Sequence, residues 1–331
     1  MQQIMRTYVV EHANGPFRPV DMPVPVPGVG QVLVRVKASG VNPLDTKIRA
    51  GKASHANQPL PAVLGLDMAG TVVAVGPGPT RFRAGDDVYG MVGGVGGTSG
   101  TLAEFVVVDA DLLAMKSKSL SMRQAAALPL VTITAWEGLV DRAKVREGQL
   151  VLVHAGAGGV GHVAIQLAKA FGAEVFATVS TRKELIVRGF GAKSIDYKAM
   201  PVKEYVALHT QGTGFDIVYD TVGGATIDES FAAVRKYTGH VVSCLGWSTH
   251  SLAPLSFRGA TYSGVFTLLP LLTGADRAHH GHILHEAAIL ADQGKLVPLL
   301  NQRQFGWSEL EDAYAAVQSG EPGKVVIDVN M

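Results

Sequence analysis

The feature that most constrains the fold is a glycine-rich turn at Gly156–Gly161, which reads Gly-Ala-Gly-Gly-Val-Gly. The turn directly follows a short apolar run, Leu150–Val153, of the kind that forms a buried parallel strand. It directly precedes apolar residues at helical spacing, which are Val163, Ile165, Leu167 and Ala168. A strand, a G-x-G-x-x-G turn and a helix in this order are typical of a dinucleotide-binding unit. A turn without a ligand is the alternative, because a chain with 39 glycines also produces chance matches.

Each glycine of this turn has a predicted task. Gly156 permits the tight turn, Gly158 lets the backbone approach a pyrophosphate, and Gly161 lets the helix pack closely on the strand. The unpaired N–H groups and the positive dipole end of the helix then face the phosphates. We therefore predict that the cofactor is bound at Gly156, Gly158, Gly159, Val160 and Gly161.

The segment after the next strand indicates which dinucleotide is bound. An NAD site places a carboxylate there to bind the ribose 2′-hydroxyl, but this chain reads Ser180-Thr181-Arg182-Lys183. Two hydroxyls and two cations suit a 2′-phosphate, so we predict NADPH, with all four residues in its site. The alternative is an ordinary solvated Arg and Lys at the start of a helix. Tyr197 flanks the adenine or the phosphate in this interpretation, or it simply packs.

Composition excludes several other classes of protein. The 331 residues are 47% hydrophobic and carry a formal net charge of +1, so neither a disordered chain nor a basic nucleic-acid surface is indicated. Cys244 is the single cysteine, which excludes an intramolecular disulfide and a multi-thiolate zinc site, and we expect it to be inert core. Met1–Gly15 does not resemble a signal peptide, and Leu150–Ala170 is too rich in glycine and histidine for a membrane span. A cytoplasmic protein is the expectation.

The strand and helix patterns predict an α/β protein with two kinds of domain. Up to about residue 125, short strand-like runs alternate with turns and suggest a barrel-like β domain; the clearest are Gln31–Lys37, Ala69–Val75 and Phe105–Val108. The middle of the chain alternates strands with helices, which indicates a doubly wound parallel sheet. Its predicted strands are Leu150–Val153, Glu174–Val179, Ser194–Asp196, Phe215–Tyr219 and His240–Cys244. Near Val265 this rhythm ends, and helices at 282–293 and 309–318 precede a last strand at 324–328.

Seven motifs in order resemble the medium-chain dehydrogenase/reductase superfamily, in its zinc-independent, zeta-crystallin-like NADPH:quinone oxidoreductase branch. They are Gly40–Asp45, Gly65–Gly70, Gly85–Val88, Ala126–Pro129, His154–Gly161, Asp220–Gly224 and Gly323–Asp328. The resemblance implies a GroES-like catalytic domain from residues 1–125 and 268–331, and a Rossmann NADP(H)-binding domain from residues 126–267. It also implies a homodimer, commonly formed through the Rossmann sheets.

The resemblance further implies hydride transfer without a metal. Zinc-dependent relatives have Cys where this chain has Asn42 and His where it has Leu66, and neither residue here is a strong zinc ligand. A competing cluster, His279, His280, His282 and His285, lacks a well-placed carboxylate, so we interpret it as a solvated histidine-rich turn. No metal is therefore predicted.

Several site residues follow from the resemblance alone. Asn42 and Thr132 are expected near the nicotinamide and the substrate, where Asn42 can donate a hydrogen bond to a developing oxyanion; an Asn in the turn before Pro43 is the alternative. Lys47 stands where several relatives carry Tyr, and it either attracts an anionic substrate or is a solvated lysine. Further cofactor contacts are assigned to Gly246, Phe266 and Lys324. No residue stands out as an obligatory general acid, so the final proton is expected from water.

Three functions remain open on the sequence alone. The leading prediction is a reductase that transfers hydride or electrons from NADPH to quinones. The second is an NADPH-dependent reductase of enones, 2-alkenals or enoyl thioesters. The third is an NADPH-binding structural or regulatory protein with little turnover, because a fold does not guarantee catalysis.

Overall fold

A computed structural model describes residues 3–329 of the chain, which divide into two compact units. The first unit contains the chain up to Leu130, the segment Leu268–Gly294 and the chain from Pro298 onward. The second contains Val131–Thr267 and Lys295–Val297.

The first unit is built on two sheets. A three-stranded sheet has the order β2-β1-β4, and a seven-stranded sheet has the order β15-β16-β3-β5-β6-β8, with β7 also pairing to β3. All of these pairs are antiparallel except β15–β16. The strands are β1 (Ile4–Val10), β2 (Arg18–Pro23), β3 (Gln31–Val41), β4 (Ala62–Val63), β5 (Asp67–Val75), β6 (Asp87–Met91), β7 (Phe105–Asp109), β8 (Leu113–Met115), β15 (Phe305–Gly306) and β16 (Val325–Asp328). The three strands predicted before residue 125 are therefore present, within β3, β5 and β7.

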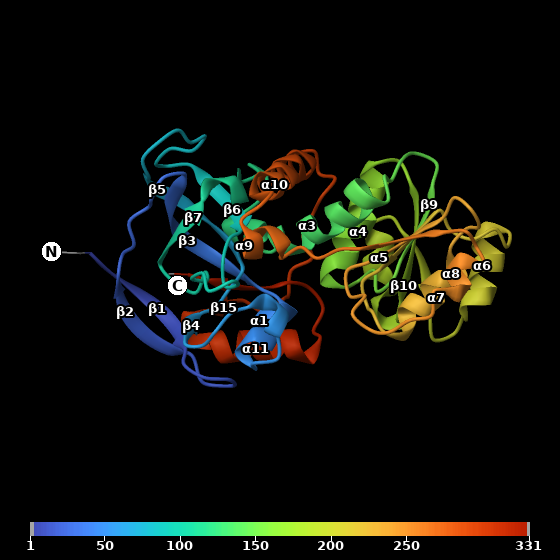
Figure 1. The fold of residues 1–331 in the computed structure, drawn as a ribbon, viewed down its shortest axis with the longest axis horizontal. Helices are drawn as coiled ribbons and strands as arrows, with labels where there is room; N and C mark the ends of the chain where they lie inside the picture. Colours follow the sequence, from blue (N-terminus) through green and yellow to red (C-terminus); the bar gives the residue numbers. More distant parts are fainter. Residues whose placement is uncertain (1–2, 330–331) are drawn as a thin grey trace. The chain divides into compact units, whose positions relative to one another are not determined.

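Helices cover parts of this sheet. Figure 1 shows α1 and α11 next to each other, and α10 packs on β6 and β8. The helices are α1 (Pro43–Arg49), α2 (Met122–Ala126), α9 (Leu269–Thr273), α10 (Arg277–Asp292) and α11 (Leu310–Ser319), with short 3-10 helices η1 (Ser54–Ala56), η2 (Ala110–Leu112) and η5 (Trp307–Glu309). The predicted helix at 282–293 begins earlier, because Asp276 adopts a left-handed conformation as the N-cap and starts the helix at Arg277.

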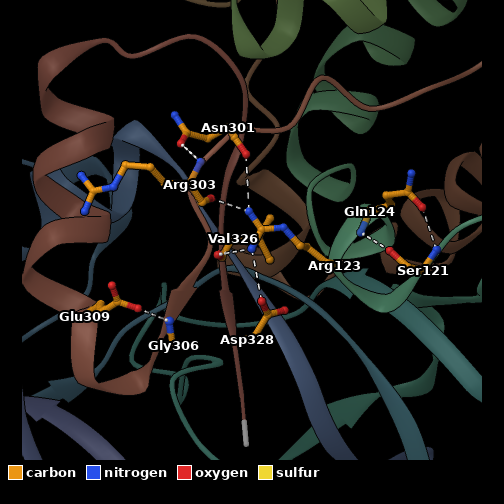
Figure 2. Close-up of polar contacts among 9 residues, drawn as sticks. All are labelled: Ser121, Arg123, Gln124, Asn301, Arg303, Gly306, Glu309, Val326 and Asp328. Atoms are coloured by element: carbon orange, nitrogen blue, oxygen red, sulfur yellow. Dashed lines mark hydrogen bonds and ion pairs between the residues drawn. The ribbon is translucent and has the colours of Figure 1, made fainter. Parts of the chain in front are cut away.

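Arg123 of α2 anchors the C-terminal part of this unit, as Figure 2 shows. Its guanidinium donates to the backbone carbonyl of Arg303 at 2.6 Å and forms an ion pair with Asp328 at 3.2 Å. Weaker contacts reach the carbonyls of Asn301 and Val326, both at 3.5 Å. One side chain from the middle of the chain thus holds the strand β16 against the sheet.

The second unit is a six-stranded, fully parallel sheet with the order β11-β10-β9-β12-β13-β14. Numbered within the unit, this is the 3-2-1-4-5-6 order of the doubly wound dinucleotide-binding fold, with the switch point between β9 and β12. The strands are β9 (Leu150–Val153), β10 (Glu174–Val179), β11 (Lys193–Asp196), β12 (Ile217–Asp220), β13 (His240–Ser243) and β14 (Thr261–Gly264). The predicted fold class, a Rossmann-type sheet with a GroES-like β domain, is confirmed.

Helices connect the strands of the parallel sheet; α4 packs against β9 and β10, and α5 packs against β10 and β11 (Figure 1). They are α4 (Gly159–Ala170), η4 (Thr181–Lys183), α5 (Glu184–Gly189), α6 (Val202–Thr210), α7 (Ala225–Ala233) and α8 (Ala253–Ser256), preceded by α3 (Pro129–Trp136) and the π-helical turn η3 (Glu137–Arg142). The apolar strands predicted from the sequence are buried here, as a sheet covered on both faces requires.

Two local contacts explain where the units divide. The N–H of Leu130 donates to Asp67 Oδ1 at 3.0 Å, which ties the start of α3 to the first unit, five residues beyond the boundary that the sequence predicts. Near the C-terminus, the Gln166 amide binds the backbone of Val297 through two hydrogen bonds of 3.0 and 2.8 Å. Residues 295–297 therefore group with the second unit.

Candidate functional site

The glycine turn lies between β9 and α4, and its first and third glycines are required by packing. A Cβ on Gly156 would lie 2.6 Å from Ala177 Cβ, and a Cβ on Gly161 would lie 2.3 Å from the carbonyl oxygen of Ala155. The left-handed residue of the turn is Ala155, with φ 53°, and not Gly156. The tight turn predicted for Gly156 is thus made by its neighbour, and Gly156 is needed for its lack of a side chain against β10.

The second glycine has different surroundings. Gly158 and Gly159 are exposed, and a Cβ on Gly158 would meet only the Ala155 carbonyl oxygen, at 3.1 Å. Gly158 is the N-cap of α4 and supplies no capping side chain. Because the first N–H groups of a helix have no intrahelical acceptor, those of Gly159, Val160 and Gly161 are oriented to bind an anion. This cradle fits the pyrophosphate of a dinucleotide.

Thr178 on β10 and two histidines hold the turn in place. Thr178 Oγ1 accepts the Ala155 N–H at 3.1 Å and lies 3.2 Å from His154 Nδ1. His162 Nδ1 lies 3.0 Å from the Gly158 carbonyl oxygen. Burial lowers the pKa of His154 to about 4, so its ring is neutral at physiological pH. Through their Nδ1 atoms, His154 contacts Thr178 and His162 contacts the turn itself, and both help to hold the turn in place.

The segment Ser180–Lys183 follows the carboxyl end of β10, beside the glycine turn. Within residues 3–329, no ion pair or side-chain hydrogen bond involves Arg182 or Lys183, and Arg182 is exposed. The Thr181 hydroxyl donates to the carboxylate of Asp196, at the end of β11. This hydrogen bond lowers the pKa of Asp196, which the sequence interpretation did not include in the site. The segment predicted to bind the ribose thus carries two cations that no described residue pairs with, and it is hydrogen-bonded to one carboxylate.

Three other predicted cofactor residues lie near the carboxyl ends of strands in this unit. Tyr197 follows β11 and is 54% exposed, so its ring does not belong to the core. Phe266 follows β14 and is 38% exposed. Gly246 follows β13, and a Cβ there would lie 2.1 Å from Tyr262 Oη. All three are on the edge of the sheet at which open α/β sheets bind ligands.

Thr132 on α3 offers a buried hydroxyl that could bind a ligand. Its side chain is fully buried, and its Oγ1 has no hydrogen-bond partner among the described residues. A buried hydroxyl without a partner is costly, and such groups often bind a ligand. Cys244 is of intermediate exposure and not part of the core, and burial raises the pKa of its thiol to about 12, which disfavours the reactive thiolate.

In the first unit, Asn42 lies at the centre of a buried polar network. Asn42 Nδ2 donates to Asp67 Oδ2 at 2.9 Å, and Asn42 Oδ1 accepts a hydrogen bond from Lys324 Nζ. The backbone N–H of Asn42 donates to Asp45 Oδ2 at 2.8 Å. All four residues are at most 5% exposed. The sequence interpretation contained Asn42 and Lys324 separately and missed both aspartates.

Burial dominates the electrostatics of this network. It raises the pKa of Asp45 to about 7 and the pKa of Asp67 to about 6, although the Lys324 ammonium opposes both shifts. Burial also lowers the pKa of Lys324, opposed by the two carboxylates. Because one ammonium faces two carboxyl groups, the network has room for one extra proton near neutral pH.

The remaining predictions concern Lys47 and a metal. Lys47 is exposed on α1, and no described residue forms an ion pair with it, which is the behaviour of a solvated lysine.

The histidines at 279–285 lie on the helix α10 and not on a solvated turn, and His280 is fully buried. Over residues 3–329, no group of three or more His, Cys, Asp or Glu side chains is placed to hold a metal ion. Nor does any helix there have the length and apolar character needed to cross a bilayer.

A parallel sheet with a glycine turn at its switch point, joined to a GroES-like unit, defines a nicotinamide-dependent oxidoreductase. Two family models match the chain: "Alcohol dehydrogenase GroES-like domain" over residues 28–118 and "Zinc-binding dehydrogenase" over residues 159–270. The 2-methylene-furan-3-one reductase of Solanum lycopersicum is 37% identical, over 90% of this chain and 71% of that protein. The chloroplastic NADPH-dependent alkenal/one oxidoreductase of Arabidopsis thaliana is 36% identical, over 90% and 72%. The chain belongs to the medium-chain dehydrogenase/reductase superfamily, as the resemblance predicted.

Solved structures agree with this assignment. An alcohol dehydrogenase superfamily protein from Novosphingobium aromaticivorans has a TM-score of 0.96 and 57% identity, covering 98% of this chain and all of that one. The quinone oxidoreductase from Coxiella burnetii has a TM-score of 0.82 and 29% identity, covering 99% of this chain and all of that one. The relatives thus include a reductase named for 2-methylene-furan-3-one, an alkenal/one oxidoreductase and a quinone oxidoreductase.

Proposed function

We propose that the chain is an NADPH-dependent, metal-independent reductase of α,β-unsaturated aldehydes and ketones. The observation that carries this proposal is the buried amide of Asn42, held between Lys324 and Asp67 at a position where zinc-dependent relatives carry a thiolate. An amide can donate a hydrogen bond to a developing oxyanion, but it is a poor zinc ligand. The two relatives named for enone and alkenal reduction support this substrate class.

The cofactor is proposed to be NADPH because Arg182 and Lys183 are free to bind a 2′-phosphate. Arg182 can form charge-assisted bonds to that phosphate, and the glycine turn can bind the pyrophosphate. The unpaired Thr132 hydroxyl is proposed to bind the nicotinamide carboxamide or the substrate. The Asp196 carboxylate is hydrogen-bonded to the segment Ser180–Lys183 through the Thr181 hydroxyl, so a 2′-phosphate bound there would have a second negative charge nearby.

The reaction we propose is reduction of the carbon–carbon double bond. Bound NADPH supplies a hydride, which is added to the β-carbon of the substrate. As that bond forms, the π electrons shift toward the carbonyl oxygen and leave an enolate, whose charge Asn42 Nδ2–H stabilises. The α-carbon then takes a proton from water, which gives the saturated carbonyl compound. Because Asn42 is shielded from bulk water, solvent does not compete for the hydrogen bond it donates.

Quinone reduction is the second candidate, supported by the Coxiella burnetii structure. A quinone is also an activated acceptor that needs little polarisation, so the same donor serves it. The two candidates are separated by kcat/KM with NADPH for trans-2-hexenal, 3-penten-2-one, crotonyl-CoA and 1,4-benzoquinone. We expect the alkenal and the enone to exceed the quinone by about tenfold or more. Turnover of the quinone alone would favour the second candidate, and no NADPH oxidation with any acceptor would favour a binding protein.

A homodimer is proposed through the outer edge of β14. This strand is the last of the parallel sheet, and no described strand pairs with its outer side. The N–H groups of Thr261 and Val265 donate to β13, so the alternate N–H groups of Tyr262 and Gly264 point outward. An unpaired edge of this kind is a ready site for strand pairing with a second copy.

A further inference from the structure

The backbone around Lys324 fixes its side chain beside Asn42. The Lys324 N–H donates to the Leu299 carbonyl at 2.7 Å, and its own carbonyl accepts the Asn301 N–H at 2.9 Å. The following residue, Val325, pairs with Val41 in the β16–β3 register. Arg123 holds the far end of the same strand, as Figure 2 shows. The backbone of Lys324 is therefore held by main-chain contacts on both sides, and its ammonium is held by hydrogen bonds to Asn42 Oδ1 and the Val41 carbonyl.

The partners of Asn42 allow only one orientation of its amide group. The Lys324 ammonium can only donate, so the atom it contacts must be the amide oxygen. The Asp67 carboxylate, when ionised, can only accept, so it must face the amide nitrogen. Asp67 is itself held by the Leu130 N–H through Oδ1 at 3.0 Å. A flipped amide would face a cation with its N–H groups and an anion with its oxygen, so the observed orientation is enforced.

This arrangement also changes the strength of Asn42 as a donor. A cation on the amide oxygen draws electron density from the amide nitrogen and makes its N–H bonds more acidic. A hydrogen bond accepted by the amide oxygen therefore strengthens the bonds that the N–H groups donate, most of all where water is excluded. Asn42 Nδ2 carries two hydrogens and donates one of them to Asp67. Its second N–H bond is the one that would donate to the substrate oxygen. Its direction and its acidity are both set by Lys324 and Asp67.

We propose that Lys324 and Asp67 are positioning residues that act on the reaction through Asn42, and that Lys324 does not bind the cofactor. The proposal rests on the proposed function of Asn42 as the donor to the substrate oxygen. Lys324 is 5% exposed, and its Nζ contacts Asn42 Oδ1 and, at 3.4 Å, the Val41 carbonyl oxygen. Among the described residues, this ammonium donates to the amide oxygen of Asn42 and to the Val41 backbone, which places its charge on the amide.

A double-mutant cycle tests this proposal, with Asn42→Ala, Lys324→Gln and the double variant assayed for kcat, KM and NADPH affinity. Removing one oxyanion donor lowers kcat by about 10²–10³-fold, and we expect Asn42→Ala to fall in this range. Lys324→Gln should lower kcat by about tenfold or more while the Kd for NADPH stays within about twofold. In the double variant the Lys324 change should add nothing, because its effect passes through Asn42.

Three results would overturn the proposal. If the two kcat losses multiply in the double variant, Lys324 acts independently of Asn42. If Lys324→Gln raises the Kd for NADPH and leaves kcat unchanged, Lys324 binds the cofactor. If Asn42→Ala keeps full activity, the proposed function of Asn42 fails as well, which distinguishes that failure from the other two.

Controls keep the test independent of folding. Lys116→Met is the matched control. The Lys116 ammonium also donates to backbone carbonyls, those of Ser117 and Leu120, and Lys116 belongs to the same unit but not to the Asn42 network. It should leave kcat unchanged. If Lys324→Gln does not fold, the pair Lys324→Met with Asp67→Asn removes both buried charges together and avoids an unpaired ion. This pair should then also add nothing to Asn42→Ala, and multiplied losses would again overturn the proposal.

Discussion

Replacing Gly158 by alanine separates the ligand-binding role of the glycine turn from its structural role. Gly158 has φ −82° and ψ 176°, which alanine adopts without strain. The new Cβ would meet only the Ala155 carbonyl oxygen, at 3.1 Å, so that neighbour has to move by a few tenths of an ångström. A compatible Gly→Ala change stabilises a fold by about 0.4–1 kcal/mol, which offsets this crowding. We expect the free energy of unfolding to stay within about 1 kcal/mol of the wild type.

The same methyl group would stand where the pyrophosphate approaches the backbone. Losing one hydrogen bond to a charged group costs roughly 1.5–3 kcal/mol, which corresponds to a rise in the NADPH Kd of about 10–100-fold. NADPH fluorescence titration measures the Kd, and urea denaturation measures the stability. Two further Gly→Ala variants serve as controls for the changes in stability and in the Kd for NADPH.

Gly161→Ala brings a Cβ within 2.3 Å of the Ala155 carbonyl oxygen and should lower stability by about 1–3 kcal/mol. Gly189→Ala, in α5 with nothing within 4 Å, should change neither the stability by more than about 1 kcal/mol nor the Kd. The reasoning is refuted if Gly158→Ala binds NADPH as tightly as the wild type.

Four further predictions concern the cofactor, metal, stability and assembly. Arg182→Ala should raise the KM for NADPH by about 10–100-fold and barely affect NADH; equal losses with both cofactors would exclude the 2′-phosphate contact. Metal analysis should find no stoichiometric zinc and EDTA should leave activity intact, whereas a tightly bound zinc needed for turnover would contradict the metal-free reaction. Burial raises the pKa of Asp45 to about 7, so the folded chain keeps a proton that the unfolded chain releases above pH 4. The stability of the wild type should therefore fall relative to that of Asp45→Asn as the pH rises from 4 to 7, by roughly 1.4 kcal/mol per pH unit. Thermal unfolding of both proteins at pH 5–8 checks this, and a stability difference that does not change with pH would contradict it. Gly264→Pro removes an outward N–H of β14 and should convert a dimer into a folded monomer in light scattering, while an unchanged mass would place the interface elsewhere.

Local patterns in the sequence predicted the parts of the fold that depend on neighbouring residues. The strand at Leu150–Val153, the glycine turn and the helix after it lie within about twenty residues, so their order alone indicated a nucleotide-binding unit. The pattern could not show that Ala155 and not Gly156 takes the left-handed conformation. Both residues are small, and the choice depends on how closely β10 packs against the turn.

The buried network around Asn42 was beyond local reasoning for a different reason. Lys324 and Asn42 are separated by 282 positions and meet because β16 pairs with β3. Asp67 and Asp45 lie in motifs that carried the family resemblance, but nothing in their spacing shows which atoms they contact. Thr181 and Asp196 likewise meet across two adjacent strands of the parallel sheet. A carboxylate at the end of the third strand of the sheet, such as Asp196 in β11, can be sought in the sequence wherever a 2′-phosphate site is predicted after the second strand.

The central claim, reduction of an activated carbon–carbon double bond, is tested most directly by the position of the transferred hydrogen. The protein is incubated with 4-phenyl-3-buten-2-one and NADPH deuterated at both C4 positions, and the product is analysed by NMR. We predict the saturated ketone with one deuterium on the β-carbon, and one NADPH oxidised for each product molecule. An allylic alcohol with deuterium on the former carbonyl carbon, or no oxidation of NADPH, would contradict the claim.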